Sequence, residues 1–143
     1  MKTIVCDIDH TLSNAAWRDS MIGVNSWDEY HSASIDDKPL HDVTDLIAKL
    51  HRLYDIVLVT ARPERFRKLT MNWLLKHNIF VDEMLMRENE NYLPAPELKR
   101  QMIEKHFQDP RSEIAFALED REDVCEMFKG LGITVLQVHG RID

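Results

Sequence analysis

Short apolar runs alternate along the chain with stretches in which apolar residues recur every three or four positions. The runs are typical of buried strands, and the recurring positions are typical of amphipathic helices. Strands are expected at 3–8, 55–60, 81–86, 114–118 and 133–138, and helices at 42–53, from Pro63 to about 78, around 98–107 and around 124–130. Strands separated by helices of this length pair in parallel through right-handed crossovers. The pattern therefore predicts an α/β fold of three layers, with a doubly wound, Rossmann-like, mostly parallel sheet of about five strands.

Length and composition favour a single domain. With 143 residues, of which 44% are hydrophobic, the chain can build one sizeable core, so 1–143 is expected to be one domain. A segment at 13–38, between the first strand and the first core helix, contains Trp17, Trp27 and Tyr30. It is too short for a full capping domain but long enough for a small helical flap. We therefore expect an open site beside a minimal cap.

The charge balance limits the classes of partner. A formal net charge of -7 speaks against a surface built for broad adhesion to nucleic acid, although a local basic patch can still contact a few phosphates. No run approaches the roughly 20 apolar residues of a membrane span, and the residues before Asp7 are too few for a signal-peptide core. We therefore expect a soluble, cytoplasmic protein with no membrane partner. Cys6 and Cys125 lack the spacing of a metal or redox pair and are expected to be buried thiols.

Candidate chemistry gathers where the expected strands end. Asp7-Ile8-Asp9-His10-Thr11 follows the first strand, Thr60 ends the second, and Glu119-Asp120 follows the fourth. The carboxyl ends of parallel strands meet at one edge of a sheet, which is where such sheets bind ligands. Taken singly, each feature has an ordinary structural interpretation as a capped turn, a strand-end threonine or a helix cap. Their common placement at one edge favours a site.

These motifs resemble the signature of the haloacid dehalogenase-like (HAD) phosphohydrolase superfamily. That signature is Asp-x-Asp-x-Thr after strand one, Thr or Ser after strand two, Lys on a later helix, and an acidic pair after strand four. The chain supplies all four elements, with Lys99 as the lysine. His10 stands where glycine is common, and Glu119 stands where aspartate is frequent. The resemblance covers nearly the whole chain and implies the HAD fold and phosphatase chemistry.

The resemblance also implies roles for the catalytic residues. Asp7 would attack phosphorus to form an acyl-phosphate. Asp9 would exchange protons with the leaving group and with water, helped by a pKa that a negative neighbour raises towards neutrality. Thr60 would bind a phosphoryl oxygen, and Lys99 would neutralise the transferring group. Thr11 either contacts the substrate or fixes the turn around Asp9.

Crowded carboxylates facing a phosphate call for a hard divalent cation, and Mg²⁺ suits oxygen ligands of this kind. The expected ligands are Asp7, the backbone carbonyl of Asp9, and Asp120. Glu119 would support them by orienting a water molecule or Lys99.

A closer resemblance concerns the substrate. The C-terminal half of the chain, from Glu97 to Val138, is similar to the 3′-phosphatase domain of bacteriophage polynucleotide kinases. In that family one arginine follows the nucleophile by eleven positions and another follows the strand-two Ser or Thr by two, which matches Arg18 and Arg62. The resemblance implies substrate-binding roles for both. No Gly-x-x-x-x-Gly-Lys-Ser/Thr loop occurs, so no kinase activity is expected of this chain.

The leading hypothesis is a Mg²⁺-dependent phosphomonoesterase for 3′-phosphates of nucleic-acid ends or deoxynucleotides. A 5′-nucleotidase for deoxynucleoside monophosphates and a non-catalytic binding domain of the same fold are the alternatives. The basic cluster Arg65, Arg67 and Lys68 either guides a phosphodiester strand or is a solvated helix face.

Overall fold

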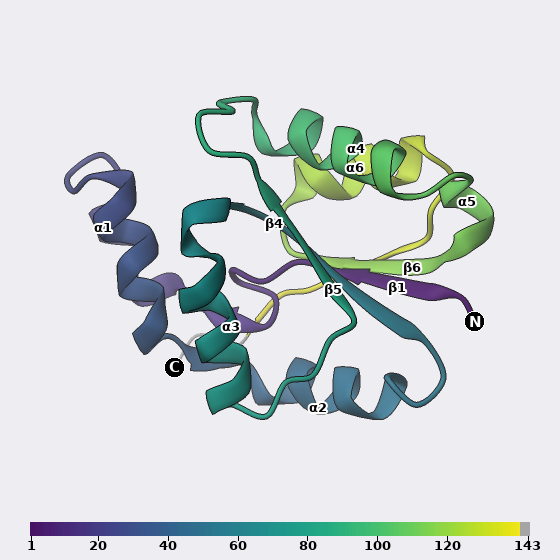
Figure 1. Ribbon diagram of the computed structural model, residues 1–143, viewed down its shortest axis with the longest axis horizontal. Helices are drawn as coiled ribbons and strands as arrows, with labels where there is room; N and C mark the ends of the chain where they lie inside the picture. The colour runs from purple at the N-terminus through teal and green to yellow at the C-terminus, as the bar shows by residue number, and fades with distance from the viewer. Residues whose placement is uncertain (141–143) are drawn as a thin grey trace.

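Five parallel strands form the centre of the structure, a computed structural model that describes residues 1–140 (Figure 1). Their order across the sheet is β5-β4-β1-β6-β7. The strands are β1 (Thr3–Cys6), β4 (Asp55–Pro63), β5 (Glu83–Arg87), β6 (Ile114–Glu119) and β7 (Val135–Gln137). The chain therefore has the doubly wound α/β fold that its hydrophobic pattern predicts.

Helices cover both faces of the sheet (Figure 1). Helices α2 (His41–Leu50) and α3 (Arg67–Lys76) lie on one face, and α4 (Ala95–His106), the short α5 (Pro110–Glu113) and α6 (Glu122–Gly130) lie on the other. Successive side chains of a strand point to opposite faces. Accordingly, Ile4 and Cys6 of β1 belong to the core with Trp73 of α3, whereas Val5 belongs to the core with Phe128 of α6.

A small flap follows the first strand. Strands β2 (Ser13–Asn14) and β3 (Lys38–Pro39) pair antiparallel at its base. Between them lie the 3-10 helices η1 (Ala16–Met21) and η2 (Ala33–Asp36) on either side of α1 (Trp27–Ser32), which stands at the side of the sheet (Figure 1). A reciprocal capping box between Ser26 and Glu29 fixes the start of α1. Trp73 of α3 donates its ring N–H to the backbone oxygen of Asp37 at 2.8 Å, which ties the flap to the body.

The second expected strand is longer than its apolar run indicates. Strand β4 continues to Pro63, which lies in register with Arg87 of β5 beyond an irregularity after Val59. The prediction that a helix begins at Pro63 is therefore wrong: a 3-10 turn, η3 (Glu64–Phe66), precedes α3. The extension places Arg62 on the strand itself, at the edge of the sheet where β1 ends.

The first strand is shorter than expected because Ile8 belongs to the turn that follows it. The backbone oxygen of Ile8 accepts N–H groups from Thr11, Leu12 and Ser13. His10 occupies the left-handed region at φ 63, which glycine adopts at lower cost. The turn leaves Asp7 and Asp9 at the end of β1 with their side chains in different surroundings.

Two further expectations concern burial. Cys6 and Cys125 are free and buried, as predicted. None of the helices within residues 1–140 has the length and apolar composition of a membrane span.

Candidate active site

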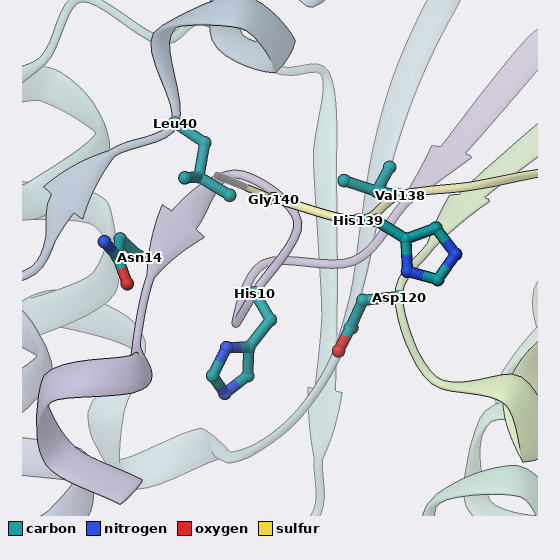
Figure 2. A pocket seen from close by; sticks show the side chains of 7 residues that line it. All are labelled: His10, Asn14, Leu40, Asp120, Val138, His139 and Gly140. Atoms are coloured by element: carbon teal, nitrogen blue, oxygen red, sulfur yellow. The ribbon is translucent and has the colours of Figure 1, made fainter. Parts of the chain in front are cut away.

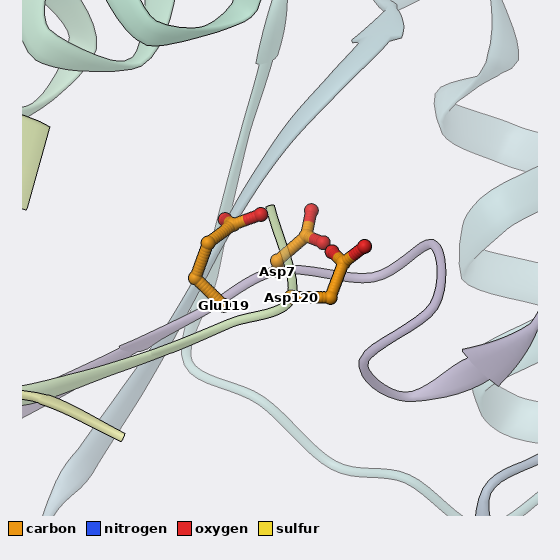
Figure 3. A group of neighbouring side chains, drawn as sticks. All are labelled: Asp7, Glu119 and Asp120. Atoms are coloured by element: carbon orange, nitrogen blue, oxygen red, sulfur yellow. The ribbon is translucent and has the colours of Figure 1, made fainter. Parts of the chain in front are cut away.

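Three carboxylates meet at the edge of the sheet (Figure 3). Asp7 follows β1, Glu119 ends β6, and Asp120 follows it; one oxygen from each lies within 4.8 Å of the others. We call these residues, together with Lys99, the acidic floor. A group of three carboxylate oxygens is the kind of donor set that a hard divalent cation prefers. The geometry thus fits the predicted Mg²⁺. Glu119 lies within the group of candidate ligands, although the sequence predicted only a supporting role for it.

Lys99 reaches the floor from α4 and is buried there. Its Nζ donates to Asp7 Oδ1 at 2.9 Å and to Glu119 Oε2 at 2.8 Å. Burial alone would lower the pKa of Lys99, but the charges of Asp7 and Glu119 outweigh it and hold that pKa well above its usual value. Lys99 is therefore charged, and it fixes the orientation of the Asp7 carboxylate. One ammonium faces three carboxylates, so the floor retains an excess of negative charge.

This excess raises the pKa values of two floor residues. Burial, followed by the charge of Asp7, raises the pKa of Glu119 to about 7. Burial and the contact with Asp7 raise the pKa of Asp120 to about 9. Without a cation, the floor therefore holds protons at neutral pH. A divalent ion would displace these protons by supplying the missing positive charge.

Asp9 faces the flap instead of the floor. Its Oδ1 accepts from Arg62 Nη2 at 2.8 Å and from Arg18 Nη2, and its Oδ2 accepts from Arg62 Nε at 3.1 Å. Burial acts to raise the pKa of Asp9, but the two guanidinium groups outweigh it and hold that pKa well below its usual range. The expectation that a negative neighbour raises this pKa is therefore wrong, because Asp9 is turned away from Asp7 towards two cations.

Asp37 completes this arrangement, and the sequence analysis did not identify it. The buried carboxylate accepts from Arg18 Nε at 2.8 Å and Nη2 at 2.6 Å, and from the Trp17 ring N–H at 2.8 Å. We call Asp9, Arg18, Asp37 and Arg62 the arginine wall. Two carboxylates face two guanidinium groups, so the wall is electrically balanced. The sequence marks Asp37 only by its position near the end of the flap.

The two threonines of the motifs occupy different positions. Thr11 Oγ1 lies 3.2 Å from Asp7 Oδ2 and 3.4 Å from Asp120 Oδ1, so its hydroxyl bridges two floor carboxylates. Thr60 is fully buried, and its Oγ1 accepts the backbone N–H of Arg62 at 3.1 Å. That bond leaves the hydroxyl proton of Thr60 available to an acceptor. The structure therefore places Thr11 at the floor and Thr60 behind Arg62.

A cavity of about 680 Å³ opens above the floor and the wall. Asp7, Asp9, Lys99 and Asp120 line its depth, and the flap helix contributes Trp27, which is 59% exposed. The volume is in the usual range for small-molecule sites. The cavity therefore gives a ligand direct access to the nucleophile predicted from the sequence.

The basic cluster after β4 is partly neutralised. Arg65 pairs with Asp28 of the flap, and Arg67 pairs with Glu64 at 2.8 Å. Arg65 also donates its backbone N–H to Asn89 at 3.1 Å, so it links the flap to the loop after β5. These contacts favour a structural role for Arg65 and Arg67.

A second cavity of about 310 Å³ adjoins the first (Figure 2). His10 and Asp120 line both cavities, and His139 stands near Asp120 in the smaller one. His10 Nε2 lies 3.2 Å from Asp19 Oδ1, which orients its ring. Asp120 is thus reached from two sides.

A family model described as the polynucleotide kinase PNKP phosphatase domain matches residues 1–141. The comparison with curated proteins found no significant match. Among solved structures, a chain of a Pnkp1/Rnl/Hen1 complex superposes with a TM-score of 0.82 at 25% identity, covering 99% of this chain and 47% of that one. A chain of the Pnkp1/Rnl/Hen1 RNA repair complex gives 0.84 at 26% identity, covering 99% and 43%. The present chain thus spans less than half the length of these relatives.

A more distant similarity concerns the fold alone. A HAD family enzyme of Bacteroides thetaiotaomicron, crystallised with magnesium and inorganic phosphate, superposes with a TM-score of 0.59 at 16% identity. The match covers 100% of this chain and 96% of that one. It assigns the five-stranded sheet with its flanking helices to the HAD fold, as the motifs predict.

Proposed function

Because this chain belongs to the family of polynucleotide kinase PNKP phosphatase domains, we propose that it is a Mg²⁺-dependent phosphomonoesterase. Its substrates are the 3′-phosphates of polynucleotide ends or deoxynucleotides, and it works through an aspartyl-phosphate intermediate. The observation that carries the proposal is the buried Lys99 bridge between Asp7 and Glu119 at the bottom of an open cavity. Phosphoryl transfer requires a fixed nucleophile beside a positive charge, and Lys99 supplies both by holding the Asp7 carboxylate.

Asp7 is the nucleophile in this proposal. One of its oxygens faces Lys99 and the other faces Thr11, so the carboxylate is held in one orientation. It attacks phosphorus while the bond from phosphorus to the sugar oxygen breaks. Water then opens the acyl-phosphate, which releases inorganic phosphate and restores Asp7.

Asp9 moves the protons. It protonates the leaving sugar oxygen in the first step and takes a proton from the attacking water in the second. Arg18 and Arg62 keep Asp9 ionised in the free protein. The second pKa of a phosphate monoester is about 6, so part of the substrate arrives as a monoanion, and Asp9 relays that proton to the sugar oxygen as the bond from phosphorus to that oxygen breaks.

Mg²⁺ would be held by Asp7 and Asp120, with the backbone carbonyl of Asp9 and the adjacent Glu119 completing or supporting the set. When bound, the ion neutralises the carboxylates and the phosphate and so favours attack by one anion on another. Thr60 and Lys99 bind phosphoryl oxygens. Arg18 and Arg62 hold Asp9 towards the leaving group, and their charges are balanced by Asp9 and Asp37.

The decisive experiment measures phosphate release from a 3′-phosphorylated oligonucleotide, a 3′-mononucleotide and a 5′-mononucleotide, with and without Mg²⁺. The proposal expects Mg²⁺-dependent release from the 3′-phosphorylated substrates and none from Asp7→Asn. Release from the 5′-mononucleotide alone would instead establish the 5′-nucleotidase. No phosphate release from any substrate, by wild type or by Asp7→Asn, would leave only the non-catalytic binding domain.

A further inference from the structure

Arg87 differs from the other arginines that line the large cavity. Arg62 pairs with Asp9, Arg65 with Asp28, and Arg121 with Asp123. Within residues 1–140, Arg87 has no carboxylate partner and bonds only to backbone oxygens. Burial accordingly lowers the pKa of Arg87, with no carboxylate to offset it. The cavity wall therefore contains a guanidinium whose charge the protein leaves uncompensated.

The contacts of Arg87 fix the direction of its guanidinium. Nε donates to the backbone oxygen of Ala61 at 2.9 Å, and Nη1 donates to those of Asn91 and Leu93 at 2.8 and 2.7 Å. Three of the five N–H groups of an arginine are thereby used. The Nη2 group keeps two N–H donors that no described residue uses, and either can donate to a phosphate oxygen.

Arg87 also lies at a distance from the nucleophile. It ends β5, and β4 separates β5 from β1 in the sheet, so about 10 Å lies between the backbones of the strands that carry Arg87 and Asp7. Its guanidinium bonds to Ala61 of β4 and to the loop at Asn91 and Leu93, and to none of the floor residues. In the proposed function the reacting phosphoryl group contacts Lys99 at the acidic floor. An anion at Arg87 is therefore a second group of the same ligand.

Tyr92 stands next to this cation at the rim of the cavity. It belongs to the loop that Arg87 holds in place, lines the cavity, and is 85% exposed. An aromatic ring so exposed contributes little to the core of the protein. Beside an uncompensated guanidinium it forms the combination on which single-stranded nucleic acids bind, a stacking platform next to a phosphate contact.

We propose that Arg87 and Tyr92 form a subsite for the nucleotide that precedes the 3′-phosphorylated terminus. Arg87 binds the phosphodiester that joins the two nucleotides, and Tyr92 stacks on the base of the preceding one. This inference rests on the proposed function and deepens it: the subsite makes the protein select a polynucleotide end over a free 3′-mononucleotide.

The test compares kcat/KM for a 3′-phosphorylated oligothymidylate and for thymidine 3′-monophosphate. Tyr92→Ala is expected to lower the value for the oligonucleotide by about fivefold or more, the loss of one stacked base, and to leave the mononucleotide within about twofold. Tyr92→Phe keeps the ring and should retain the wild-type ratio.

Arg87→Gln should lower the oligonucleotide value and reduce the slope of its dependence on salt concentration by about 0.7 in log–log units, the contribution of one phosphate contact on a single strand. Arg100→Gln, on the exposed face of α4, is the matched control and should change neither value.

Equal losses on both substrates in Tyr92→Ala and Arg87→Gln would overturn the subsite, because they would mean that the two residues only hold the loop. Arg87→Gln removes three hydrogen bonds to backbone oxygens, so the folding of this variant is checked by thermal melting. Tyr92→Ala removes none of these bonds and tests the subsite independently of Arg87→Gln. Anisotropy of the labelled oligonucleotide bound to the same variants separates the two proposals. Absent turnover with Tyr92-dependent binding would refute the phosphatase and keep the subsite, whereas turnover with unchanged ratios would do the opposite.

Discussion

The acidic floor and the arginine wall lie on either side of one turn and handle charge in opposite ways. On the floor, three carboxylates face one ammonium, and the pKa values of Glu119 and Asp120 are raised. On the wall, two carboxylates face two guanidinium groups, and the pKa of Asp9 is lowered. Asp7 and Asp9 are two positions apart, yet one belongs to each region. The difference shows that the wall balances its charges within the chain, whereas the floor keeps a negative excess that bound protons or a divalent cation can neutralise.

The largest effect is expected from breaking the floor at its nucleophile. Asp7→Asn should lower turnover of a 3′-phosphorylated oligonucleotide by at least about 10³-fold, because the amide cannot attack phosphorus. The melting temperature should not fall, since the change removes one of three crowded negative charges. Phosphate release and thermal melting are measured on the same preparation. Turnover close to wild type would remove Asp7 from the chemistry and the floor with it.

The wall should instead lose stability when one partner is removed. Arg18 and Asp37 are both buried, so Arg18→Gln removes two of the three hydrogen bonds that the Asp37 carboxylate accepts. Breaking a buried ion pair is expected to cost about 3–5 kcal/mol of unfolding free energy, and urea denaturation of the variant measures this loss. The double variant Arg18→Gln/Asp37→Asn should recover part of the loss. An unchanged free energy in the single variant would mean that the wall is not a balanced unit.

A smaller effect, a few degrees in melting temperature, is expected from pH and Mg²⁺. The pKa values of Glu119 and Asp120 are raised on folding, so the floor favours the folded state at low pH. This contribution is lost as pH rises through about 7 and about 9. Mg²⁺ should therefore raise the melting temperature more at pH 8.5 than at pH 5.5, where the floor is protonated. Asp120→Asn should flatten this dependence, and an equal Mg²⁺ effect at both pH values would contradict the uncompensated floor.

The smallest expected effect is a shift in one titration on the wall. Arg62→Gln removes two of the hydrogen bonds that Asp9 accepts and one of its two neighbouring positive charges, so the pKa of Asp9 should rise. Nuclear magnetic resonance of the labelled carboxyl carbon reports this shift directly. Leu53→Gln, at an exposed position after α2, provides the control. An unmoved titration would show that Arg18 alone sets the charge of Asp9.

The sequence was most informative where a rule of topology applies. Parallel pairing determines that Asp7 and Asp120 meet, because both follow strands that run in the same direction side by side. The sequence contains no comparable rule for the direction of a side chain. Asp9 points towards Arg18 and Arg62, so its pKa is lowered where the sequence predicted that it would be raised. Asp37 escaped prediction because its partner, Arg18, lies across a flap whose path no periodic pattern describes. Pro63 led to a wrong prediction because a proline can start a helix. Here it is the last residue of β4, which pairs with the edge strand β5.

The position of β1 at the centre of the sheet has a consequence for the order in which the protein folds. Thr3 pairs with Asp55 on one side and with Ile114 on the other, 52 and 111 residues further along the chain. Contacts across such separations close large loops and form slowly. A chain synthesised from its N-terminus holds Asp7 from the start, but it must wait for β6 before Asp120 can join it. Asp7 and Asp120 therefore come together only once β6 has paired with β1, and a chain in which this pairing has not formed has no acidic floor.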